Sequence, residues 1–264
     1  IDWDRERLSR KKGIEERELI RFALFVVESP NKARQIARFF GRPNVRVMGD
    51  SIVYEAVLSD MVVTIVPTLG HMVDLPTRDR RFRNLHGVVV GERIIPIFDT
   101  VKRCPELGVS FVDEEYYLRN CKEIKDMKDH IANLRKLALE SELVIIGTDP
   151  DTEGEKIAWD VLNLIGPFAE KVVRAEFHEV TRPAIERALR EARDVDERMV
   201  EAQMVRRIED RWLGFELSGF VTRLFSPHGN RTYSAGRVQS PVLGWIVERT
   251  LEARKRKLIG VDER

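Results

Sequence analysis

The sequence predicts an α/β fold with a mostly parallel sheet and flanking helices, followed by an all-helical part of a second domain. Two short runs, residues 23–27 and 143–146, are apolar without a break, which is typical of strands buried on both faces of a parallel sheet. Helical patterns alternate with strands up to about residue 193, and only helical patterns follow from residue 196. We place the domain boundary near residue 178.

Each apolar run is followed by a helix signal. After the first run we expect a helix that buries Ile36, Ala37, Phe39 and Phe40 and ends at Gly41. Further strands are expected at residues 45–48, 61–66, 88–90, 94–97 and 172–177, and further helices at residues 122–140, 152–166, 181–193, 196–223 and 238–257. The predicted organisation is a charged linker or helix at 1–21, an α/β domain at 22–177 with an insertion around 77–121, and an incomplete helical domain at 178–264.

Composition narrows the class of protein. The chain has 264 residues, 45 basic and 44 acidic, and 43% of its residues are hydrophobic, so it can form a real core under a highly charged surface. No apolar run is long enough for a membrane span, and the start does not look like a signal peptide, so we expect a cytoplasmic protein with no membrane partner. Arg greatly outnumbers Lys and Gln is rare, which favours a thermophile. The first residue is Ile rather than Met, which suggests a piece of a longer chain or a processed subunit.

Acidic residues follow both apolar runs. Glu28 comes directly after the first run, and Asp149, Asp151 and Glu153 follow the second. Because the carboxyl ends of parallel strands meet at one edge of a sheet, and because Pro150 favours an extended Asp149, we expect a carboxylate pair aimed at one point. Such carboxylates need a shared proton or a hard cation, and their oxygen ligands suit Mg²⁺. The alternative is ordinary turn chemistry, with Glu28 as an exposed helix cap.

Lys32 is expected one helical turn beyond Glu28, near a helix N-terminus that already favours an anion. Acid, metal and lysine at one sheet edge describe a phosphoryl-transfer site.

Two segments carry a resemblance to a known family. Glu28-Ser29-Pro30-Asn31-Lys32 and the segment at residues 149–155, DPDTEGE, resemble the two signatures of the Rossmann-like Toprim domain of type IA topoisomerases, bacterial-type primases and some nucleases. Four further segments resemble motifs of the topoisomerase branch in that family's order, at residues 70–75, 177–181, 203–211 and 234–240. The resemblance covers residues 22 to 257.

The resemblance implies a reaction and roles for residues. Type IA enzymes cut one DNA strand with a tyrosine that becomes linked to the 5′ phosphate, pass another strand through the break and reseal it. By resemblance, Glu28 would be the general acid for the leaving 3′ oxygen and Lys32 would stabilise the phosphate. The same comparison gives a metal set of Glu28, Asp149, Asp151 and Glu153, and a DNA-binding set of Arg206, Arg207, Asp210, Arg237, Gln239, His71 and His178.

The helix at residues 203–211 has two opposite faces by its spacing. An apolar stripe contains Val205, Ile208, Trp212 and Phe215, and a polar face contains Gln203, Arg207, Asp210 and Gly214. We expect the apolar stripe to be core. The alternative for the polar face is a solvated surface with local ion pairs.

The nucleophile and the remaining modules are expected outside the chain. The family's tyrosine motif lies downstream of residues 234–240, and none of Tyr54, Tyr116, Tyr117 or Tyr233 sits in such a motif. We therefore expect the chain alone to be inactive and to need a tyrosine-bearing topoisomerase segment or subunit. The alternatives are a Toprim nuclease or primase-like domain, or a non-catalytic DNA-binding fragment.

Residues 94–104 resemble the insertion that in reverse gyrases leads into a zinc knuckle. Only one cysteine of each zinc-binding pair remains, Cys104 and Cys121, so we predict no zinc and expect packing to replace it. Two cysteines also fit a reducing compartment. The same resemblance predicts that ATP acts only through a helicase-like ATPase module outside this chain, to which residues 1–21 would be the junction. It also predicts that the protein is nucleoid-associated and that its reaction changes DNA supercoiling.

Overall fold

The computed structural model describes residues 21–49, 51–58, 61–76, 88–90, 93–95, 98–226 and 231–258. The chain forms two compact units, residues 1–76 with 97–204 and residues 77–96 with 205–264. A charged linker or helix is predicted at residues 1–21, and residues 1–20 of it lie outside the described residues, as do part of the insertion and the end of the strand expected at 94–97. The domain boundary near residue 178 stays a prediction.

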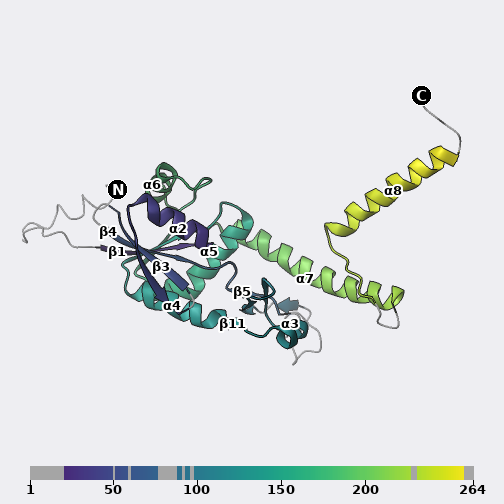
Figure 1. Cartoon of the computed structure of the whole chain (residues 1–264), viewed down its shortest axis with the longest axis horizontal. Helices are drawn as coiled ribbons and strands as arrows, with labels where there is room; N and C mark the ends of the chain where they lie inside the picture. Colours follow the sequence, from purple (N-terminus) through teal and green to yellow (C-terminus); the bar gives the residue numbers. More distant parts are fainter. Residues whose placement is uncertain are drawn as a thin grey trace, which may run out of the picture. The chain divides into compact units, whose positions relative to one another are not determined.

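A six-stranded sheet forms the centre of the first unit (Figure 1). Its order is β13 (Lys171–Arg174), β12 (Leu143–Gly147), β1 (Arg21–Val27), β4 (Met61–Pro67), β3 (Ser51–Leu58) and β2 (Asn44–Met48). The first four strands run parallel, and β3 and β2 are antiparallel to their neighbours. The predicted mostly parallel sheet is therefore confirmed, and the carboxyl ends of β4, β1 and β12 lie next to one another.

Helices cover both faces of this sheet. They are α2 (Pro30–Phe39), α4 (Met127–Leu139), α5 (Thr152–Ile165), which continues into the short helix η1 (Gly166–Phe168), and α6 (Arg182–Arg190). Alternate residues of β1 point to opposite faces, so Phe25 packs in one core with α2 and α6, and Leu24 in the other with α4 and α5. This two-sided burial explains why β12 and the part of β1 from Ala23 to Val27 have no polar side chain.

Several predicted bounds differ from the structure; the helix expected at 181–193, for example, ends at Arg190. The helix expected to begin at residue 122 begins at Met127, because the Asp126 side chain caps it by accepting from the Lys128 N–H at 2.9 Å. The strand expected to run to residue 177 ends at Arg174.

Small β elements form three further sheets, separate from the main sheet. β9 (Lys102–Cys104) pairs with β10 (Val109–Phe111) and with β11 (Lys125–Asp126), and α3 (Glu115–Asn120) lies between β10 and β11 in sequence. β5 (Val73–Asp74) pairs with β8 (Asp99–Thr100), and β6 (Val88–Val90) with β7 (Arg93–Ile95).

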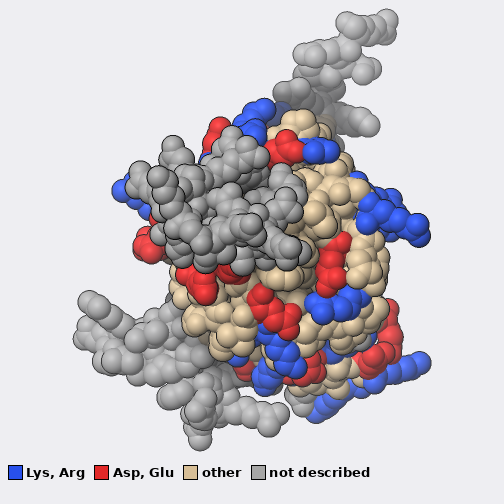
Figure 2. All heavy atoms as spheres, turned by 90° about the vertical axis from the view of Figure 1, so that its left-hand side faces the viewer, with Lys and Arg blue, Asp and Glu red and all other residues tan. Residues whose placement is uncertain are grey.

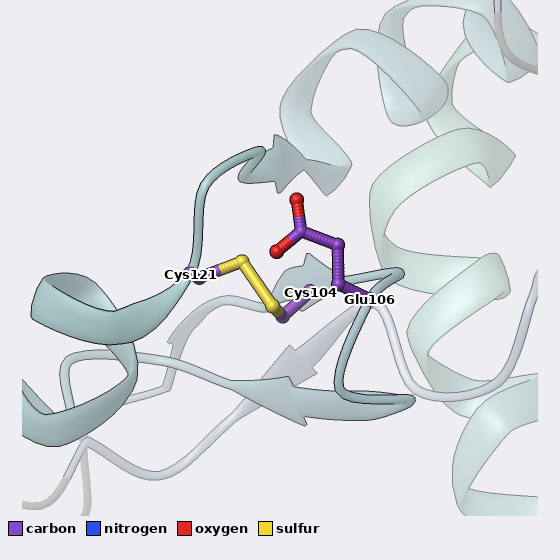
Figure 3. A group of neighbouring side chains, drawn as sticks. All are labelled: Cys104, Glu106 and Cys121. Carbon is purple, nitrogen blue, oxygen red and sulfur yellow. A yellow bond between two sulfur atoms is a disulfide. The ribbon is translucent and has the colours of Figure 1, made fainter.

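Cys104 and Cys121 form a disulfide, with Glu106 beside it (Figure 3). The expectation that packing replaces the zinc knuckle is therefore incomplete, and the expectation of reduced cysteines is wrong for this pair. The physical reason is that β9 and the end of α3 bring the two Cα atoms to 6.0 Å, which the sequence separation of 17 does not reveal.

We expect the variant Cys121→Ser to be less stable than the wild-type chain by about 3 kcal/mol, because the disulfide lowers the conformational entropy of the unfolded chain by closing a short loop. For a chain of this size that corresponds to a fall in Tm of roughly 6 to 12 °C. The measurement is thermal unfolding followed by circular dichroism, with and without a dithiol reductant. Reductant should lower the Tm of the wild-type chain and leave the variant unchanged; equal Tm values for both oxidised proteins would contradict this.

The second unit is built on two helices. α7 (Glu197–Phe225) begins in the first unit and continues through the second, and α8 (Gln239–Leu258) follows the segment at residues 231–238. This segment is fixed to α7 at two positions one turn apart: Ser218 exchanges hydrogen bonds with the backbone of Ala235, and Thr222 does so with Tyr233. None of the helices in the described part of the chain is both long and apolar enough to span a bilayer.

The face assignment predicted for α7 is wrong at two positions. Val205, expected in the core, is exposed, and Gln203, expected on the polar face, is buried. The cause is a partner in another element: the Gln203 side-chain oxygen accepts a hydrogen bond from Thr152 Oγ1 at 2.9 Å. The side chains of Trp212 and Phe215 lie outside the described part.

Candidate phosphoryl-transfer site

Three neighbouring strand ends form the candidate site. Glu28 follows β1, the acidic loop at residues 148–153 follows β12, and His71 follows β4. Backbone bonding between β1 and β4 extends beyond the strands, because Thr68 N–H donates to the Val27 carbonyl at 2.7 Å and Leu69 N–H donates to the Glu28 carbonyl at 3.1 Å. The position of Glu28 is therefore set by two strands.

The turn after β4 has an unusual backbone. Leu69 adopts a left-handed conformation with φ of 66°, followed by Gly70 with φ of 92°. A left-handed conformation is costly for Leu and is kept only where the surroundings enforce it. It turns the chain so that His71 Nε2 lies 3.0 Å from Glu153 Oε1.

Lys32 lies in the first turn of α2, as predicted. Ser29 caps this helix by accepting from the Lys32 N–H at 3.3 Å, and Pro30 occupies its first turn. The Lys32 ammonium forms an ion pair with the Asp149 carboxylate. The helix N-terminus and the ammonium together give this edge of the sheet an anion-binding character.

The acidic loop is shaped by close backbone contacts. Asp151 caps α5, because its Oδ1 accepts from the Gly154 N–H at 2.7 Å, and Thr148 Oγ1 donates to the Gly154 carbonyl at 2.6 Å. A Cβ atom added at Gly154 would collide with the backbone of Asp149. The loop can therefore fold back over the start of α5 only with glycine at position 154.

Glu28 is half-buried among charges of its own sign. Burial is the largest influence that raises the pKa of its carboxyl, and the charge of Asp149 raises it further; Lys32 opposes both, and Glu153 and Asp151 add smaller increases. A carboxyl with a raised pKa keeps its proton more readily, which suits a general acid.

The donor set fits a magnesium ion. Glu28, Asp149, Asp151 and Glu153 offer only oxygen ligands, and a cation among them would relieve the repulsion that raises the Glu28 pKa. In the described ranges no three ligand atoms of these acids lie within 4.8 Å of one another, so the acidic site is open; the one group that meets this distance contains Cys104 and Cys121, which are disulfide-bonded and offer no thiolate. An open site is compatible with Mg²⁺, which keeps several waters and binds through one or two carboxylates.

Among the other predicted DNA-binding residues, His178 belongs to the first unit and the rest to the second. The side chain of His178 is 79% exposed and lies 3.5 Å from Glu176. Arg206, Arg207, Asp210, Arg237 and Gln239 belong to the second unit.

Arg237 and Asp210 form a two-pronged ion pair, with Arg237 Nε 2.6 Å from Oδ1 and Nη2 3.1 Å from Oδ2. Arg206 lies 3.9 Å from Asp210. Gln239 Nε2 donates to Ser234 Oγ at 3.2 Å. The Arg237–Asp210 pair thus joins the segment at residues 234–239 to α7, whereas the Gln239–Ser234 hydrogen bond lies within the segment.

Surface charge does not add a large basic patch on the face shown in Figure 2, where basic and acidic side chains are interspersed.

Buried charged residues next to the site were missed from the sequence. Glu155 and Arg174 are buried and paired, and Lys156 pairs with Asp160 at 2.6 Å while donating to the Val73 carbonyl at 2.9 Å. Glu155 was visible as the last residue of the DPDTEGE signature, but without a role. Nothing in the local sequence marks Arg174 as buried.

Comparison with protein families identifies the class of protein to which the chain belongs. Residues 23–180 match the family model of the Toprim domain, and residues 194–258 match the family model described as DNA topoisomerase. The chain therefore belongs to the Toprim family, with a type IA topoisomerase segment after the Toprim domain. The resemblance predicted from the motifs is confirmed, and the topoisomerase match favours that interpretation over a nuclease or primase-like domain.

More particular similarities are to reverse gyrases. The chain is 49% identical to reverse gyrase of Pyrococcus horikoshii over 96% of its own length, and 43% identical to reverse gyrase 2 of Aquifex aeolicus over 97%. It covers 16% and 22% of those two proteins. Among solved structures it is similar to full-length topoisomerase I from Thermotoga maritima, with a TM-score of 0.58 and 27% identity over 87% of this chain and 30% of that one. The chain thus spans only a fraction of the length of these relatives.

Proposed function

We propose that this chain supplies the acid, Mg²⁺ and strand-binding half of a type IA topoisomerase site in a reverse gyrase, with the nucleophilic tyrosine outside the chain. The observation that carries the proposal is the juxtaposition of Glu28, Lys32 and Asp149 at the ends of the adjacent strands β1 and β12. ATP would act through a helicase-like module elsewhere, in a nucleoid-associated protein of the cytoplasm.

The residues of this chain divide the work at the scissile phosphate. Glu28, with its raised pKa, gives its proton to the leaving 3′ oxygen and takes it back during resealing. Lys32 exchanges its contact with Asp149 for the phosphate, at the N-terminus of α2. Asp149 and Asp151, supported by Glu153, would hold Mg²⁺, which supplies positive charge against the phosphate oxygens when bound.

The second unit would bind the single strand. Arg237 is paired with Asp210, so a DNA phosphate would compete with this carboxylate for the guanidinium. We assign three more residues of the second unit to the same DNA-binding surface: Gln239, Arg206 and Arg207. Two residues of the first unit, His71 and His178, would also contact the DNA.

We expect Arg237→Ala to weaken binding of a fluorescent single-stranded oligonucleotide and to reduce the slope of log affinity against log salt by about 0.7, the value for one lost phosphate contact. Fluorescence anisotropy over a salt series gives both quantities. Arg182→Ala is the matched control, because Arg182 also pairs with one carboxylate, Glu186, but lies in the first unit. An unchanged slope in Arg237→Ala would remove Arg237 from the DNA surface.

The experiment that tests the proposed function is relaxation of a negatively supercoiled plasmid with Mg²⁺ at high temperature. The chain is assayed alone and with a tyrosine-bearing topoisomerase fragment, with and without ATP and a helicase-like module. Activity only after mixing supports a shared active site. Mg²⁺-dependent nicking by the chain alone, without resealing, would instead favour a Toprim nuclease.

A further inference from the structure

Arg174 connects three elements around the acidic loop. Its side chain is fully buried at the end of β13. Nη2 donates to the Asp149 carbonyl at 2.9 Å, and Nη1 donates to the Ile146 carbonyl at 3.2 Å and to the Ala175 carbonyl at 2.6 Å. Nε donates to Glu155 Oε2 at 3.1 Å. One guanidinium thus joins the end of β12, the loop that carries Asp149, and helix α5.

Glu155 is the charge partner that keeps Arg174 in place. Its two carboxylate oxygens also accept from Arg193, at 2.8 and 3.3 Å, and Oε1 accepts from the Asp196 N–H at 2.6 Å. Both carboxylate oxygens of Glu155 are therefore bonded to donors from three residues, Arg174, Arg193 and Asp196, and this holds Glu155 beside the Arg174 guanidinium.

Stability alone does not explain such a buried pair. Taking two charges out of water costs several kcal/mol per ion, and apolar residues of similar size often serve a core as well or better. What apolar residues cannot do is donate to the carbonyl of Asp149. Lys could not replace Arg either, because only the planar fork reaches carbonyls and a carboxylate in several directions at once.

We propose that Arg174 is a positioning residue, which fixes the Asp149 carbonyl and thereby the direction of the Asp149 and Asp151 carboxylates. The role of Arg174 in metal binding rests on the proposed Mg²⁺ site. Its role in fixing the loop is supported by the hydrogen bonds alone. Arg174 acts through the loop and touches neither metal nor substrate.

The test compares Arg174→Lys with Arg193→Lys in the full chain. Both variants keep their charge and lose the guanidinium of a Glu155 partner, but only Arg174 contacts the Asp149 loop. Two quantities are measured: Mg²⁺ affinity by isothermal titration calorimetry, and amide hydrogen exchange of residues 148–155 without metal. We expect Arg174→Lys to lower Mg²⁺ affinity by about tenfold or more, the usual size for a residue that orients a ligand, and to speed loop exchange. Arg193→Lys should change the affinity less than about twofold.

Unchanged loop exchange and unchanged affinity in Arg174→Lys would overturn the inference. If the wild-type chain binds no Mg²⁺, the proposed site fails, and loop exchange still decides whether Arg174 fixes the loop. If Arg174→Lys does not fold, hydrogen exchange is measured instead on the double variant Arg174→Gln with Glu155→Gln, in which neither of these two positions carries a charge. Loop exchange as slow as in the wild-type chain would contradict the inference.

Discussion

The variant Asp149→Asn is expected to bind Mg²⁺ at least about tenfold more weakly than the wild-type chain. Asn keeps the shape of the side chain and one oxygen but removes the negative charge, and at short range one charge in a partly shielded site contributes a few kcal/mol, against 1.4 kcal/mol for each tenfold change. The measurement is isothermal titration calorimetry with MgCl₂ at constant ionic strength.

The metal-free stability of this variant should change little. Asp149 is paired with Lys32, but the side chains are 39% and 24% exposed, and ion pairs with this much solvent contact contribute about 1 kcal/mol or less. Asp129→Asn, an exposed aspartate on α4, is the control and should leave Mg²⁺ affinity unchanged. Equal affinity of Asp149→Asn and the wild-type chain would mean that the acids at the sheet edge do not form the metal site.

The variant Gly154→Ala should be destabilised and should lose Mg²⁺ binding together. The added Cβ meets the nitrogen, carbonyl carbon and oxygen of Asp149, which are backbone atoms and cannot move aside without displacing the acidic loop. Overpacking of this kind costs about 1 to 3 kcal/mol, which is roughly 2 to 12 °C in Tm for a chain of this size. Thermal unfolding and Mg²⁺ titration measure the two effects.

Gly244→Ala is the matched control for this substitution. Gly244 lies inside α8, where an added Cβ has no atom within 4 Å. Because Ala is a better helix former than Gly by about 1 kcal/mol, this variant should be equally or more stable and should keep its Mg²⁺ affinity. Stability changes of opposite sign in the two Gly→Ala variants would separate the effect of the collision from the general effect of replacing glycine by alanine. A Gly154→Ala chain with unchanged Tm and unchanged Mg²⁺ affinity would contradict the loop geometry.

The parts of the fold that could be predicted are those that local pattern determines. Residues 23–27 of β1 and all of β12 are buried on both faces and therefore have no polar side chain, and Ser29, Pro30 and Asp151 mark the starts of α2 and α5. Strand β3 was not predicted, although it is well buried in places, because its polar and apolar residues do not alternate strictly and Glu55 lies within it. The length of a strand such as β13 depends on its neighbour rather than on its own sequence.

The candidate site likewise has a part that could be predicted from the sequence and a part that could not. Glu28, Lys32 and the acidic loop could be placed together because parallel strand ends meet at one edge, whatever the contacts in detail. Arg174 could not be found, since its burial depends on Glu155, 19 residues earlier in the chain and on another element. The pairing of Cys104 with Cys121 and the burial of Gln203 against Thr152 likewise depend on contacts between elements.

The most direct test of the shared active site is to find which polypeptide becomes linked to DNA. A single-stranded oligonucleotide carrying a label on the 5′-phosphate side of the cleavage position is incubated with this chain, the tyrosine-bearing fragment and Mg²⁺, and the reaction is stopped with denaturant before electrophoresis. We predict label on the tyrosine-bearing fragment, only when this chain is present, and none when Glu28→Gln replaces it. Label on this chain itself would show that it carries its own nucleophile and would contradict the proposal.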